Sequence, residues 1–120
     1  MLIDQQAIPP VLAQLQGEDS EKEGVSELLL AVLRHTGAAG IRFTPEQLLA
    51  VGAHMLAAQR RGESGEALPE VGAETLEQVS PSALELSRSV LEPFAAERQY
   101  VWNATEALLL AVHFEAAMEE

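Results

Sequence analysis

Cysteine is absent from the 120 residues of this chain, which excludes disulfide bonds and thiolate metal sites. Aromatic side chains make up only 4% of the residues, so the core has to be built from aliphatic side chains. Basic residues number 7 against 19 acidic ones, which gives a formal net charge of −12. Direct binding to nucleic acid or to an anionic membrane surface needs clustered cations, so neither partner is expected.

Long hydrophobic runs are also missing. No apolar stretch reaches the roughly 20 residues that a helix needs to span a bilayer. The N-terminal residues lack the basic start and the apolar segment of a signal peptide. We therefore expect a cytoplasmic protein.

Apolar residues, mostly Leu and Ala, make up 48% of the chain and favour helix over sheet. No alternating strand pattern interrupts the helical periodicity, which is clearest at positions 25, 28, 29, 32 and 33. We predict an all-α protein, a compact bundle of about five helices. Residues 1–19, with Pro9 and Pro10 interrupting any helix, are expected to form a partly flexible N-terminal arm. Residues 20–120 are expected to form the helical domain.

Capping patterns predict where the helices begin. The first is expected at 20–37, capped either by Ser20 in a capping box with Glu23 or by Ser26. Thr44-Pro45-Glu46-Gln47 combines an N-cap, a first-turn proline and a second capping box, and predicts a helix to about residue 61.

The second half of the chain is punctuated by proline. A short helix is expected at 69–79, and another begins after Ser80 and heads towards residue 98. Pro93 lies inside that segment and predicts a kink or an early end near residue 91. The Asn103-Ala-Thr-Glu106 pattern predicts a capping box that opens a last helix to about residue 118.

His54 and His113 each lie about halfway along an apolar helical segment. Histidine changes charge near neutral pH and can act as a nitrogen nucleophile, so both are candidate functional residues. By helical spacing, Arg61 shares a face with His54 two turns on, and Glu106 shares a face with His113 two turns before it. The third histidine, His35, lies near a helix C-terminus, where a cation favours the dipole.

Two motifs carry a resemblance to a known family. His54, followed by Ala58 and Arg61, resembles the first histidine motif of the phosphotransferase-system regulation domain, or PRD. Glu106 and His113, seven residues apart across an apolar Leu-Leu-Leu-Ala-Val run, resemble its second histidine motif. Leu68-Pro69 occupies the place of the family's connecting segment, and helix order agrees from about residue 26 to residue 118.

The resemblance implies a bacterial regulatory domain of the antiterminator and transcription-activator kind. His54 and His113 would be phosphoacceptors, receiving phosphoryl groups from HPr or from an EIIB component of the sugar phosphotransferase system. Phosphorylation would act through a homodimer or a transcriptional regulator partner. Arg61 would contact or support the phosphoryl group, because arginine suits bidentate phosphate contacts, with Glu106 as a supporting residue. No enzymatic turnover and no cofactor are expected.

Other interpretations remain open. The family usually has Asp immediately before the first histidine, where this chain has Ala53, and this favours a helical protein–protein interaction module that is not phosphorylated. Each histidine can also be an ordinary packed ring, and Glu106 simply a capping residue. An enzyme with Glu106 and His113 as an acid–base pair is disfavoured, because about 10 Å of helix separates them. The histidine spacing does not match a metal site.

Overall fold

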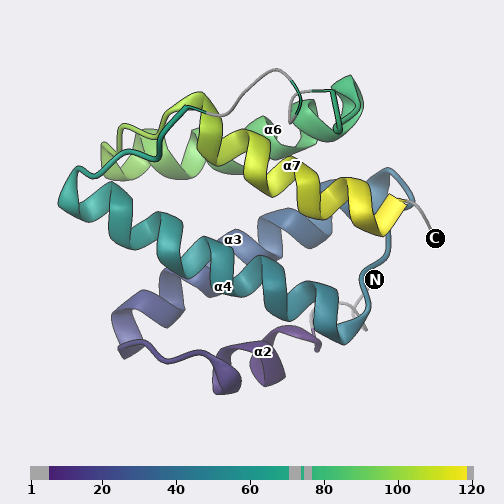
Figure 1. Cartoon of the computed structure of the whole chain (residues 1–120). Coiled ribbons are helices and arrows are strands. Elements are labelled where there is room, and N and C mark those ends of the chain that lie inside the picture. The colour runs from purple at the N-terminus through teal and green to yellow at the C-terminus, as the bar shows by residue number, and fades with distance from the viewer. Residues whose placement is uncertain (1–5, 71–73, 75–76, 119–120) are drawn as a thin grey trace.

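The computed structural model describes residues 6–70, 74 and 77–118. These residues contain no strand. The elements are α2 (Ile8–Gln14), α3 (Asp19–Ala38), α4 (Pro45–Ser64), α6 (Pro81–Arg98) and α7 (Ala104–Met118). The prediction of an all-α bundle is confirmed. Figure 1 shows α4 and α7 side by side, with α3 and α6 packed against them and α2 at one edge.

The core is aliphatic, as the composition requires. The predicted helical positions Val25, Leu28, Leu29 and Val32 are all buried on one face of α3, whereas Leu33 is only partly buried. Phe114 of α7 is fully buried and meets the Phe43 ring edge-on at 6.0 Å between centroids. Burial of this apolar surface is the main force that holds the helices together.

Helix α4 begins as predicted. The Thr44 side chain accepts a hydrogen bond from the Gln47 amide at 3.1 Å, and the Gln47 side chain accepts one from the Thr44 amide at 2.9 Å. The helix runs to Ser64, three residues beyond the expected end, and stops at Gly65 in the left-handed conformation with a φ of 81°.

Helix α3 begins earlier than predicted. Its N-cap is Glu18, and neither Ser20 nor Ser26 caps it. The Glu21 carboxylate accepts from the Glu18 amide at 2.9 Å and also pairs with Arg60 of α4 at 2.8 Å. The capping box is therefore formed by Glu18 and Glu21, and the Glu21 carboxylate also has a cationic partner, Arg60, on a neighbouring helix.

The described part of the predicted arm is packed against the domain. Helix α2 begins at Ile8, so Pro9 and Pro10 occupy its first turn, where a missing N–H costs nothing, and they do not block the helix. Ile8, Val11 and Leu15 are buried in the core. Residues 8–15 are thus part of the helical domain.

Pro93 lies inside α6, where the sequence predicted a kink or an early end. The helix continues through Pro93 to Arg98, so the expected early end near residue 91 is wrong. Pro93 lies on the exposed side, where solvent can satisfy the carbonyl that loses its helical N–H, while its neighbours Leu91 and Phe94 are buried. Of the helix expected at 69–79, residues 71–73 and 75–76 lie outside the described residues.

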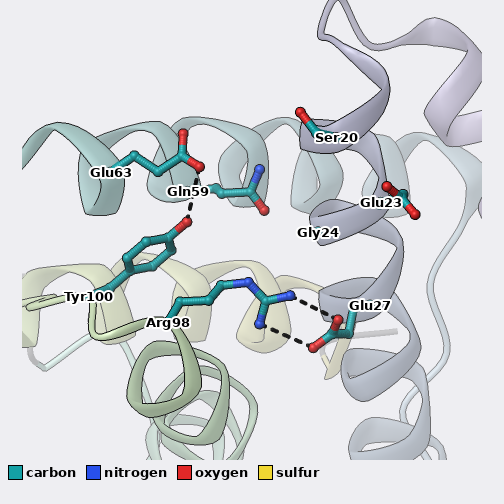
Figure 2. A pocket seen from close by; sticks show the side chains of 8 residues that line it. All are labelled: Ser20, Glu23, Gly24, Glu27, Gln59, Glu63, Arg98 and Tyr100. Atoms are coloured by element: carbon teal, nitrogen blue, oxygen red, sulfur yellow. Dashed lines mark hydrogen bonds and ion pairs between the residues drawn. The ribbon is translucent and has the colours of Figure 1, made fainter.

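The end of α6 is tied to α3 and α4 around a pocket of about 270 Å³. Arg98 pairs with Glu27 of α3 at 2.9 Å, and the Tyr100 hydroxyl donates to Glu63 of α4 at 3.3 Å (Figure 2). The Arg98 guanidinium also lies 3.7 Å above the Phe94 ring. These contacts fix the chain just before it enters α7.

Substitution of Gly52 tests the packing of α2 on α4. A Cβ at Gly52 would lie 2.7 Å from Cγ1 of Val11, closer than van der Waals contact allows. We expect Gly52→Ala to lower the free energy of unfolding by about 1–3 kcal/mol, measured by urea denaturation. Gly37→Ala is the control, because a Cβ there meets nothing within 4 Å. Equal stability of the two variants would contradict the close contact between α2 and α4.

Candidate functional site

The four residues singled out in the sequence meet between α4 and α7. The two helices are antiparallel, and the pairs His54–Arg61 and Glu106–His113 are each separated by seven residues. Equal spacing on antiparallel helices places the two histidines opposite each other and Arg61 opposite Glu106. The centroids of the His54 and His113 rings are 5.7 Å apart.

Arg61 and Glu106 form a bidentate ion pair. Nε of Arg61 lies 2.5 Å from Oε2 of Glu106, and Nη2 lies 2.9 Å from Oε1. The Glu106 side chain is only 1% exposed, and the Arg61 side chain is 19% exposed. A buried carboxylate needs such a partner, and the first turn of α7 adds the favourable end of the helix dipole.

The predicted capping box at the start of α7 is not formed. The Glu106 carboxylate pairs with Arg61, and the Asn103 side chain donates from Nδ2 to the Leu68 carbonyl at 2.7 Å. Thr105 donates to the Pro69 carbonyl at 3.1 Å. The segment that follows α4 is therefore held across the start of α7, which leaves Glu106 free to pair with α4.

The carboxylate of Glu106 also faces His54. Nε2 of His54 lies 3.8 Å from Oε1 of Glu106, too far for a hydrogen bond, and this nitrogen is buried without a partner. Sequence reasoning paired Glu106 with His113 of the same helix, and the structure places it beside His54 of the opposite helix. The residue before His54 is an exposed alanine, Ala53, which has no carboxylate. The carboxylate near His54 is therefore that of Glu106.

Burial keeps both rings neutral at neutral pH. Desolvation lowers the pKa of His54 to about 4, and the attraction of Glu106 only partly opposes it. Burial also lowers the pKa of His113 from its ordinary value of 6.5. The His54 side chain is 11% exposed, and His113 is partly exposed. Each ring thus presents a nitrogen lone pair at pH 7, as a nucleophile requires.

Metal binding is a weaker interpretation of the same pair. Over the described residues, no three His, Asp or Glu side chains converge as metal ligands. The carboxylate nearest to the histidines is already occupied by Arg61. His35, the remaining histidine, lies in the last turn of α3, the position predicted for it.

Sequence reasoning missed the aromatic residues that support this site. The Trp102 indole donates to the Ala58 carbonyl of α4 at 2.8 Å, one turn beyond His54. Its ring stacks on Phe94 at 5.9 Å between centroids, and Tyr100 packs against both. The signal was the gathering of three scarce aromatic residues within positions 94–102.

Comparison with solved structures shows the same fold in a regulator. The chain is similar to the crystal structure of a PRD-containing transcription regulator from Lactobacillus casei ATCC 334, with a TM-score of 0.76 and 26% sequence identity. The likeness covers 95% of this chain and 94% of that one. No family model and no curated protein matches the sequence. The fold is therefore PRD-like. No helix in the described part of the chain is long and apolar enough to cross a membrane.

Removal of Arg61 tests the buried ion pair. Arg61→Met leaves the Glu106 carboxylate buried without a cation, and we expect a loss of about 3–5 kcal/mol in the free energy of unfolding. Arg60→Met is the matched control, because Arg60 is 50% exposed and pairs with Glu21 at the surface. We expect a much smaller loss there. Similar losses in urea denaturation of the two variants would show that Glu106 does not depend on Arg61.

Titration of His54 makes stability depend on pH. Its pKa is about 6.5 when unfolded and about 4 when folded, so between pH 7 and pH 5 only the unfolded chain gains the proton. Stability therefore falls as the pH drops, with about 2 kcal/mol lost through His54 over this range. We expect the dependence, measured by urea denaturation at both pH values, to weaken by that amount in His54→Gln. An unchanged dependence would place His54 in contact with solvent.

Proposed function

We propose that this chain is a regulatory domain of the bacterial sugar phosphotransferase system that accepts a phosphoryl group on histidine. The observation that carries the proposal is the paired His54 and His113, with the Arg61–Glu106 ion pair beside them, on a PRD-like fold. The phosphodonors that the resemblance implies are HPr and an EIIB component. The chain would be the acceptor in the transfer and would not turn over a small molecule.

The state of the two rings suits phosphoryl transfer. A neutral imidazole nitrogen can donate its lone pair to phosphorus, forming an N–P bond while the bond between phosphorus and the donor breaks and its electron pair returns to the donor. Because burial lowers the pKa of both His54 and His113, little of this neutral form is lost at pH 7. Transfer therefore needs no separate base to prepare the nucleophile.

Access distinguishes the two histidines. Nε2 of His54 is buried and lies 3.8 Å from the Glu106 carboxylate, so an anionic phosphoryl group on that atom would meet both steric closure and repulsion. His113 is partly exposed, and desolvation is the only cause that shifts its pKa. His113 is thus the favoured acceptor, and His54 could accept only through its other ring nitrogen.

Charge explains how the modification would signal. A phosphoryl group adds about 1.5 to 2 negative charges to a chain that already carries −12. Arg61 supplies a positive charge to the cluster and would support the modified state. We propose that this change alters association, either in a homodimer or with a transcriptional regulator partner. The net charge disfavours direct contact with nucleic acid.

The alternative is a helical interaction module with the same fold that is not phosphorylated. Ala53 is the residue that favours it, since it stands where the PRD family usually has Asp. In this case the His54–His113 pair would serve only to pack α4 against α7.

A transfer assay separates the two functions. The protein is incubated with radiolabelled phosphoenolpyruvate, enzyme I and HPr, with or without EIIB components, and acid-labile label is measured. We expect labelling that His113→Ala abolishes or reduces at least about tenfold and that His54→Ala reduces less. His35→Ala is the matched control and should label normally. Absence of label with every donor would contradict phosphorylation and favour the interaction module. Sedimentation of labelled and unlabelled protein would show whether phosphorylation changes the association of the chain.

A further inference from the structure

We propose that His54 takes up a proton when His113 is phosphorylated, so that its imidazolium lies between the phosphoryl group and Glu106. The inference rests on the proposed phosphorylation of His113 and assigns to His54 the role of a positioning residue and proton carrier.

The geometry places His54 between two groups of α7. On one side, Oε1 of Glu106 lies 3.8 Å from Nε2 of His54. On the other side, the His113 ring lies 5.7 Å away between centroids. Nε2 is buried and has no hydrogen-bond partner, so it has an unused capacity to donate towards Glu106 if it bears a proton.

Charges of both signs act on His54 before phosphorylation. The groups that act on it in the described structure are Glu106 and His113 of α7 and Arg61 of its own helix. Glu106 favours the imidazolium, whereas Arg61 and His113 oppose it, and burial decides in favour of the neutral ring. A second anion on His113 would add to the effect of Glu106, and Arg61 is already engaged by both oxygens of Glu106.

The proton would change the site in two ways. It offsets one of the roughly two negative charges that the phosphoryl group adds, close to where they are added. It also converts the 3.8 Å approach of Nε2 to Oε1 into a charge-assisted hydrogen bond, which links α4 and α7 more tightly. Phosphorylation of His113 and proton uptake by His54 would then favour each other, each raising the equilibrium constant of the other.

Nitrogen-15 NMR of the imidazole side chains tests the proposal on the full chain, which has only three histidines. The protein is phosphorylated with phosphoramidate, a chemical donor, and phosphorus-31 spectra confirm the N–P bond. We expect the pKa of His54 to rise from about 4 by about two units or more when His113 is phosphorylated. A His54 ring that stays neutral at pH 5 in the phosphorylated protein would overturn the proposal, as would phosphorylation at His54 in place of His113.

A pair of variants repeats the test without phosphorylation. His113→Glu places a carboxylate on α7 opposite His54, and His113→Gln has a similar size without the charge. We expect a higher His54 pKa in His113→Glu than in His113→Gln, and equal values would overturn the proposal. Because neither phosphoramidate nor these variants involve HPr or EIIB, failure of those donors would count against the proposed function alone.

Discussion

The buried ion pair between Arg61 and Glu106 is the interaction on which the rest of the site depends. The Glu106 carboxylate is only 1% exposed, and its pairing with Arg61 holds this turn of α4 against the first turn of α7. Such a pair need not add net stability over an apolar contact. Its effect is on register, because it sets His54 opposite His113 and holds a carboxylate beside His54.

Opposing electrostatic effects then define the state of the histidines. Desolvation favours neutral rings, Glu106 favours a protonated His54, and His113 and Arg61 oppose that protonation. The result is two neutral, partly accessible imidazoles in a strongly acidic chain, a state that suits a phosphoryl acceptor. We propose that an anion added at His113 changes the protonation of His54, because it would add to the attraction of Glu106 for the imidazolium. The chain shares this PRD-like fold with a PRD-containing transcription regulator.

Local sequence patterns predicted some helix ends and failed at others for a physical reason. The Thr44 capping box is specified entirely by adjacent residues, and it formed as predicted. Around residues 18–26, several carboxylates and hydroxyls could cap α3. The capping box is formed by Glu18 and Glu21, and Glu21 also pairs with Arg60. Glu106 likewise had a local capping role available and paired with α4 instead. At both of these helix starts, the carboxylate pairs with an arginine that is distant in sequence.

The sequence by itself determined the helical periodicity, the aliphatic core and the seven-residue spacing that puts a charged residue two turns from each histidine. These properties depend only on the residue order along one helix. The tertiary structure alone decided that α4 and α7 pack antiparallel in a register that joins both pairs, and that Glu106 faces His54 and not His113. That outcome depends on how two helical faces fit together across the core, and no pattern within either helix encodes it.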